Sequence, residues 1–241
     1  MYDNNGKNGK ELGDVLFGWK RKFDNFMYQY KFLVLAIAAI AAIILFAVVQ
    51  CAAKTPPDAD IAYAGFRIFD VFEMNRIQDA FNEILGEDLN GDGKIHTNFV
   101  HFLFMTDAQI EDAQARGEII DVSAVRIVRT QLGLEVLAAN NIIYFLSPEA
   151  YRSIVRINGI NSFMYADEAL GYIPPENILF DEFALRLSEL PCYEYFEGIS
   201  AFPENTLIAI RDKRAGDNSA ADQKHERNIM LFKKIAGFST T

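Results

Sequence analysis

The run FLVLAIAAIAAIILFAVV, from Phe32 to Val49, contains no charged residue, proline or glycine. As an α-helix it would be roughly 27 Å long, close to the thickness of the hydrocarbon core of a bilayer. A buried core helix of that length normally carries polar residues on one face. We therefore expect residues 32–50 to form a single transmembrane helix.

Charges are distributed unequally about this run. Residues 1–54 hold 7 Lys and Arg against 4 Asp and Glu, whereas residues 55–241 hold 16 against 29. Lysine and arginine next to a membrane helix favour the cytoplasmic side. We expect a single-pass protein of the cell membrane with a cytoplasmic N-terminus and an extracellular C-terminal domain. The acidic domain argues against binding to nucleic acid or anionic lipid.

Three interpretations of the apolar run remain open. An uncleaved signal-anchor is favoured, because the polar head of 31 residues and the long apolar core are atypical of a cleaved signal peptide. Ala53 would nevertheless suit the position before a cleavage site. A lipoprotein would be modified at Cys51, but the bulky Gln50 precedes it, where such signals have a small residue.

The flanks of the run predict three further segments. Residues 1–10 are polar and rich in Gly and Asn, which is typical of a disordered cytoplasmic tail. Residues 11–31 repeat apolar and aromatic residues every three or four positions beside Lys20–Lys22. They predict an amphipathic juxtamembrane helix that lies at the headgroups or simply extends the anchor. Residues 51–60 include Pro56-Pro57 and predict a stiff linker.

The remaining segment, residues 61–237, is long enough for one domain with its own core. Its hydrophobic patterns alternate between strand and helix periods. Strands are expected at 61–69, 95–105, 141–146 and 206–211, and helices at 72–85, 109–116, 123–138, 148–157 and 221–235. This alternation predicts an α/β domain with a mixed, largely parallel sheet.

A candidate ligand site follows the apolar strand NIIYFL at 141–146. Ser147 and Pro148 are typical of a helix start, so the strand turns directly into a helix. Open α/β sheets bind ligands at such turns, and the free N–H groups of a helix start suit an anion. We expect Ser147, Glu149 and Tyr151 to line the site, although a capped helix without a ligand explains the same residues.

The segment DLNGDGKI, from Asp88 to Ile95, resembles the start of the calcium loops of EF-hands and dockerin-type modules. Asp88, Asn90 and Asp92 stand at the positions of the first three oxygen ligands, and Gly93 permits the sharp turn. Lys94 would add its carbonyl group and His96 the ninth position, whereas Phe99 replaces the usual bidentate acid. Glu83 or Glu87 would then have to complete a Ca²⁺ site. The alternative is an Asx-rich turn without an ion.

No catalytic constellation is recognisable, so we assign no catalytic residue and rank a hydrolase last. Cys192, Asp181 and Glu182 would be its candidate groups, but a buried thiol and surface acids explain them equally. We expect instead a non-enzymatic binding domain for a small molecule, a glycan or a partner protein. The alternative is an accessory subunit of a cell-envelope complex, with an exposed apolar patch within 180–190 or 193–202.

Four segments together resemble uncharacterised membrane-anchored extracellular proteins of Gram-positive, Clostridia-type bacteria. They are the aromatic and basic stretch 23–31, the DLNGDGKI block, NIIYFLSPEAY at 141–151 and PENTLIAIRDKR at 203–214. The outer part is also similar to one lobe of extracellular solute-binding proteins. The resemblance implies a ligand-binding domain on the cell surface. It carries over no site residues, and a complete two-lobed protein of that kind is much longer.

Overall fold

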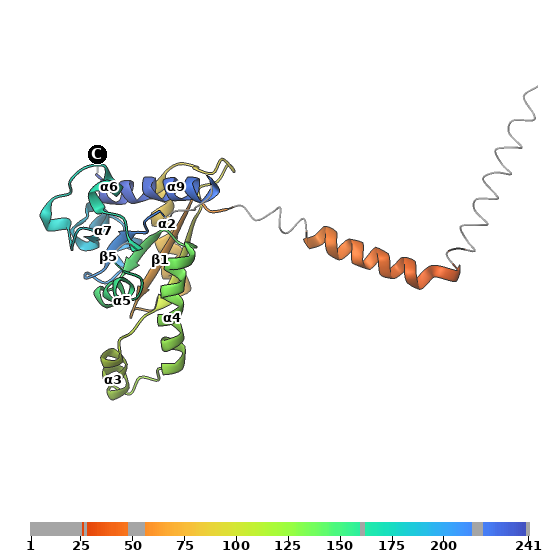
Figure 1. Ribbon diagram of the computed structural model, residues 1–241, viewed down its shortest axis with the longest axis horizontal. Helices are drawn as coiled ribbons and strands as arrows, with labels where there is room; N and C mark the ends of the chain where they lie inside the picture. The colour runs from red at the N-terminus through yellow and green to blue at the C-terminus, as the bar shows by residue number, and fades with distance from the viewer. Residues whose placement is uncertain (1–25, 27, 48–55, 160–161, 214–218, 240–241) are drawn as a thin grey trace, which may run out of the picture. The chain divides into compact units, whose positions relative to one another are not determined.

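The computed structural model describes residues 26, 28–47, 56–159, 162–213 and 219–239 (Figure 1). The chain divides into two compact units, residues 1–55 and 56–241, which are described separately below. The expected tail at 1–10, most of the expected helix at 11–31 and residues 48–55 lie outside the described residues. Residues 48–55 include the end of the expected anchor and the first half of the expected linker.

The first unit contains one long apolar helix, Tyr28–Ala47, of 20 residues with a mean hydropathy of 2.5. None of it is buried, in contrast to a core helix of a globular domain. At 1.5 Å per residue it is roughly 30 Å long, which matches the hydrocarbon core of a bilayer. The expectation of one helix long and apolar enough to span a membrane is therefore confirmed for residues 28–47.

The second unit is built on a five-stranded mixed sheet of order β2-β1-β3-β5-β4. β1 pairs in parallel with β2 and β3, whereas β5 is antiparallel to both β3 and β4. Four of the five strands consequently run in the same direction. The strands are β1 (Ala59–Gly65), β2 (Thr97–Leu103), β3 (Ile143–Leu146), β4 (Ala184–Arg186) and β5 (Leu207–Ile210).

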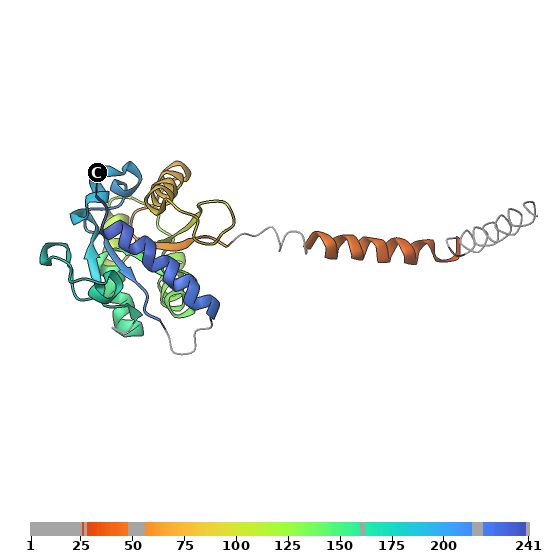
Figure 2. The same ribbon diagram turned by 90° about the horizontal axis from the view of Figure 1, so that it is seen from above.

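Helices cover both faces of the sheet. Ile61 and Tyr63 of β1 face a core that α2 (Val71–Leu85) and α9 (Ser219–Ala236) complete. Ala62 and Ala64 face the opposite core, made with α4 (Val122–Ala138) and α5 (Pro148–Asn158). Both faces of β1 are thus buried, as its mostly apolar sequence favours, and its one charged residue, Asp60, pairs with Lys224. Figures 1 and 2 show α9 and α4 on different sides of the strands.

Shorter elements complete the second unit. α3 (Asp107–Ala115) follows β2, and Thr106 and Gln109 form a capping box at its start. α6 (Ala166–Leu170) and the 3₁₀ turn η2 (Glu176–Ile178) precede β4. The turn η3 (Leu187–Glu189), α7 (Pro191–Tyr195) and α8 (Glu197–Ser200) lie between β4 and β5.

The expected α/β class with a mixed sheet is confirmed, but several details differ from expectation. β1 begins at Ala59, inside the range expected for the linker, and Asp58 is fully buried. The expected strand at 61–69 ends at Gly65, because Asp70 caps α2 and the chain must leave the sheet beforehand. The segments 180–190 and 193–202 supply core rather than an exposed apolar patch. Only Tyr195 among their large apolar side chains is exposed.

Candidate functional site

The strand order places a topological switch point between β1 and β3. The connection from β1 to β2 runs through α2 on one face, and the connection from β2 to β3 runs through α4 on the other. Ligands of open α/β sheets bind beside such a point, outside the carboxyl ends of the strands. The carboxyl ends of β2 and β3 lead directly into α3 and α5.

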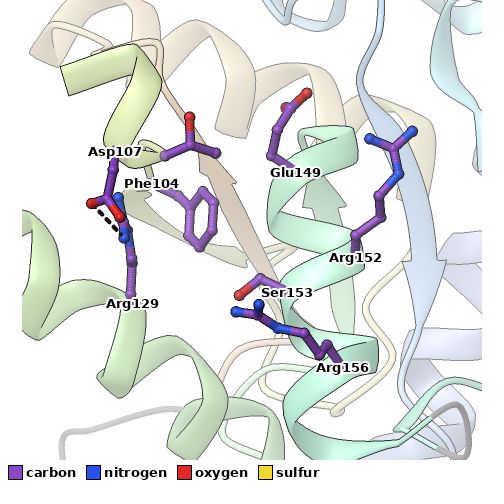
Figure 3. A pocket seen from close by; sticks show the side chains of 8 residues that line it. Phe104, Asp107, Arg129, Glu149, Arg152, Ser153 and Arg156 are labelled. Atoms are coloured by element: carbon purple, nitrogen blue, oxygen red, sulfur yellow. Dashed lines mark ion pairs between the residues drawn. The ribbon is translucent and has the colours of Figure 1, made fainter. Parts of the chain in front are cut away.

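A cavity of about 370 Å³ lies beside these strand ends, between the starts of α3 and α5 and the middle of α4. Its lining comes from the end of β2 and the start of α3 (Phe104, Thr106, Asp107), from α4 (Arg129) and from α5 (Glu149, Arg152, Ser153, Arg156). We call it the arginine cavity. Figure 3 shows Arg129 and Arg156 reaching toward the same space from two helices, whereas Arg152 extends away from Arg129.

Arg129 is held rigidly at the wall of the arginine cavity. Its Nη1 lies 3.1 Å from Asp107 Oδ1, and its Nε donates to the Met105 carbonyl oxygen at 2.6 Å. The guanidinium carbon lies 5.9 Å from the centre of the Phe104 ring. Nη2 is buried and has no hydrogen-bond partner among the described residues. This donor is closed off from the cavity, so a bound acceptor would reach it only after a neighbouring side chain had moved.

Arg152 and Arg156 stand one helical turn apart on α5 and are both exposed. Neither forms an ion pair within the part of the chain that the structure describes. The lining thus holds three arginines against Asp107 and Glu149, in a domain whose overall charge is strongly negative. This local excess of positive charge favours an anionic ligand.

The structure separates the three residues that the sequence grouped into a ligand site. Ser147 is buried, and its Oγ accepts the Ala150 N–H at 3.2 Å as the cap of α5. Tyr151 is buried against Phe163 and donates to Asp181 Oδ2 at 2.7 Å, and burial raises the pKa of its hydroxyl. Only Glu149 lines the arginine cavity.

Two of the three candidate catalytic groups, Asp181 and Cys192, are engaged in holding the fold, whereas Glu182 is exposed. The second oxygen of Asp181, Oδ1, accepts the Phe183 and Ala184 N–H groups, so both oxygens are engaged. Cys192 is fully buried, and burial raises the pKa of its thiol to about 12. A thiol with that pKa is protonated at neutral pH and is a poor nucleophile.

The calcium-like loop is held by a chain of side-chain-to-backbone hydrogen bonds. Asp88 accepts the Asn90, Gly91 and Gly93 N–H groups, and the Gly93 bond is the main reason for its lowered pKa. Asn90 Oδ1 accepts the Asp92 N–H, and Asp92 Oδ1 accepts the Lys94 N–H. These contacts bring Asp88, Asn90 and Asp92 into one turn.

The oxygen atoms of this loop form only part of a ligand set for a cation. Phe99 lies in β2 and packs its ring against Phe69 and Phe81, and Glu87 pairs with Lys234. Among the described residues, no three His, Cys, Asp or Glu side chains gather closely enough to hold a metal ion. His96 turns its Nδ1 toward Gln78 at 3.3 Å. Asp92 Oδ2, however, is buried without a hydrogen-bond partner in the described structure.

The main support of the loop, Asp58, was not recognised in the sequence. Its Oδ1 accepts the Leu89 and Asn90 N–H groups at 2.8 and 2.9 Å, and its Oδ2 accepts the His96 N–H at 2.8 Å. The arginine cavity was also missed, although Arg152 and Arg156 are four residues apart on a predicted helix. That spacing, in a domain of acidic composition, is the sequence signal that could have revealed the cavity.

No family model, curated protein or solved structure matches this chain.

Proposed function

We propose that the chain is a single-pass membrane protein whose second unit binds a small phosphate- or carboxylate-bearing molecule outside the cell. The observation that carries this proposal is the arginine cavity in an otherwise acidic domain. The helix Tyr28–Ala47 supports the membrane anchor, and the excess of Lys and Arg before it supports a cytoplasmic N-terminus. We propose non-enzymatic binding, since two of the three candidate catalytic groups, Asp181 and Cys192, are engaged in the fold.

The chemistry of the cavity matches an anion with several acceptor oxygens. Guanidinium groups bind carboxylate and phosphate through paired N–H donors, and such charge-assisted bonds are stronger than neutral ones. Arg129 supplies a fixed, partly exposed guanidinium group, and Arg156 forms no ion pair with any described residue. The cavity also borders the N-terminal ends of α3 and α5, where the helix dipole favours negative charge.

Methyl phosphate is the probe that tests this proposal. We expect calorimetric titration to detect its binding to the full chain in phosphatidylcholine nanodiscs, with empty nanodiscs as the blank. Arg156→Gln should weaken binding at least tenfold, because it removes a charge-assisted hydrogen bond of about 1.5–3 kcal/mol. Arg126→Gln is the matched control, since Arg126 lies on α4 but does not line the cavity. Equal affinities in all three proteins would refute the proposal.

An accessory role in an envelope complex is the second candidate function. One observation favours it: four large apolar side chains between β1 and the first turn of α2 are exposed, namely Phe66, Ile68, Val71 and Phe72. Clustered exposed apolar residues mark protein contacts more often than chance. The methyl phosphate titration separates the two candidates, because an accessory role requires no anion in the arginine cavity.

We also propose that the loop at Asp88–His96 binds Ca²⁺ weakly, supported by the buried, unpartnered Asp92 Oδ2. Weak extracellular calcium modules have dissociation constants of about 0.1–1 mM. At ten times that concentration a bound ion stabilises the domain by about 1.4 kcal/mol, which corresponds to roughly 3–5 °C in melting temperature.

The calcium proposal is tested by thermal melting of the full chain in EGTA, then in millimolar Ca²⁺ and then in Mg²⁺. We expect a rise with Ca²⁺ alone, abolished by Asp92→Asn and retained by Asp121→Asn, which changes an exposed helix cap elsewhere. If Ca²⁺ leaves the melting temperature unchanged, the loop is an Asx-rich turn that needs no ion.

A further inference from the structure

A second cavity, of about 290 Å³, adjoins the arginine cavity along α4 and α5. The two share Arg129, Ser153 and Arg156, so one ends where the other begins. From Arg129 to Leu137 the second cavity follows α4 over roughly 12 Å of helix. Together the two cavities form one groove between the helices, which we call the α4–α5 groove.

The far end of the α4–α5 groove is apolar. Leu134, Leu137 and Ile157 line it, and Leu134 and Ile157 are 60% and 57% exposed. Gly133 lies on the same stretch of α4, where a Cβ would meet Ile157 Cγ2 at 3.7 Å. Gly133 is buried where α4 and α5 come close together, and Asn158 Nδ2 donates to its carbonyl oxygen at 3.0 Å. When an apolar chain covers exposed aliphatic side chains, the burial of apolar surface lowers the free energy of the complex.

We propose that the ligand of the α4–α5 groove is a single-chain anionic amphiphile. Its phosphate or carboxylate head would contact Arg129 and Arg156, and its aliphatic tail would lie against Leu134, Leu137 and Ile157. This inference rests on the proposed function and adds the tail to the anion. This occupant fits the groove at both ends: its anionic head complements the arginines, and its tail covers the exposed aliphatic side chains. Small-molecule sites usually combine apolar contacts with a few orienting polar groups in this way.

Hexyl phosphate, compared with methyl phosphate, isolates the contribution of the tail. Both probes carry the same head group, and both are titrated calorimetrically into the full chain in phosphatidylcholine nanodiscs. We expect hexyl phosphate to bind at least tenfold more tightly. Leu134→Ser should abolish this advantage and leave methyl phosphate binding unchanged, whereas Arg156→Gln should weaken both probes. Ile127→Ser is the matched control, since Ile127 is 57% exposed on α4 but lines neither cavity.

The outcomes separate this inference from the proposed function. Equal affinities for the two probes would refute the tail and leave the anion site standing, whereas binding of neither would refute both. Self-association of the chain that Leu134→Ser abolishes, without a hexyl advantage, would assign the apolar end to a second copy and overturn the inference. Nanodiscs that contain phosphatidic acid identify the source of the ligand. If phosphatidic acid in the bilayer competes with hexyl phosphate, the ligand is a bilayer lipid. If it does not compete, the ligand is a free amphiphile. Both results require that hexyl phosphate binds in the groove.

Discussion

Gly198→Ala is expected to destabilise the second unit by about 3 kcal/mol or more, because α8 touches α2 at this residue without any intervening side chain. A Cβ at Gly198 would overlap the carbonyl oxygen of Arg76 and lie 2.7 Å from its carbonyl carbon. It would also lie 3.0 Å from the Ile77 backbone nitrogen. All three atoms belong to the helical backbone, which cannot move aside as a flexible side chain can. Overpacking typically costs about 1–3 kcal/mol, and the rigid backbone of α2 places this case at or above the upper end.

Urea unfolding of the full chain in detergent, followed by circular dichroism, measures this loss. Gly133→Ala is the matched control, because a Cβ there meets only ordinary contacts of 3.7 and 3.9 Å. In the interior of α4 the same substitution should stabilise the helix by about 0.5–1 kcal/mol. The two changes are therefore expected to act in opposite directions. An unchanged midpoint for Gly198→Ala would mean that α8 moves away from α2 without loss of packing.

The longer elements of the second unit were predictable because their sequences carry a clear period. The helices expected at 72–85, 123–138 and 148–157 correspond to α2, α4 and α5 within a residue or two. Ser147 and Pro148 marked the start of α5 through capping chemistry, which acts locally. The strand expected at 206–211 corresponds to β5.

Other features depend on contacts between distant segments and were not predictable in this way. β4 has three residues, too few to show an alternating pattern. The antiparallel direction of β5 appears only in its pairing with β3 and β4, which come from other parts of the sequence. Gly198 is one of 15 glycines, and only the neighbouring helix distinguishes it.

The candidate site shows the same division. Glu149 lines the arginine cavity beside the end of β3, where a helix start after an apolar strand has few geometric options, and its part in binding stays a prediction. Tyr151 and Ser147 lie equally close in sequence but turn inward, and a single helical turn decides between cavity and core. Arg129 comes from a different helix, so its approach to Arg156 required the packing of α4 on α5. Tertiary packing, rather than local sequence, creates the arginine cavity.

Asp58→Ala is the second change with a large expected effect, a loss of about 3 kcal/mol in the free energy of unfolding. Asp58 is fully buried, and its carboxylate accepts three backbone N–H groups of the loop at 89–96. Alanine would leave the Leu89 and His96 N–H groups without their acceptor, whereas the Asn90 N–H would keep Asp88 Oδ1 at 3.2 Å. A buried unsatisfied group costs about 1–3 kcal/mol. The sum is moderated because part of the loop is solvent-exposed and water can replace some of the lost bonds.

Asp58→Asn is expected to lower the free energy of unfolding by less than Asp58→Ala, and Asp121→Ala is the control variant. Asparagine retains one oxygen for the Leu89 and Asn90 N–H groups but presents an NH₂ group to the His96 N–H, so we expect a loss of about 1–2 kcal/mol. Asp121 makes a single capping bond at an exposed helix start, and its loss should cost about 1 kcal/mol. Urea unfolding in EGTA measures all three variants without any contribution of bound Ca²⁺. Equal stability of Asp58→Ala and the unchanged protein would contradict this account.

The same contacts determine where the folded unit begins. Asp58 and the Pro56 carbonyl, which accepts from Asn90 Nδ2, fasten the residues ahead of β1 to the loop between α2 and β2. The sequence-based boundary at residue 61 would remove both contacts and the first two residues of β1. A chain shortened to begin at Ile61 should therefore lose at least as much stability as Asp58→Ala, whereas one that begins at Pro56 should keep the stability of the full chain. Equal stability of the two fragments would show that the loop holds its shape without Asp58.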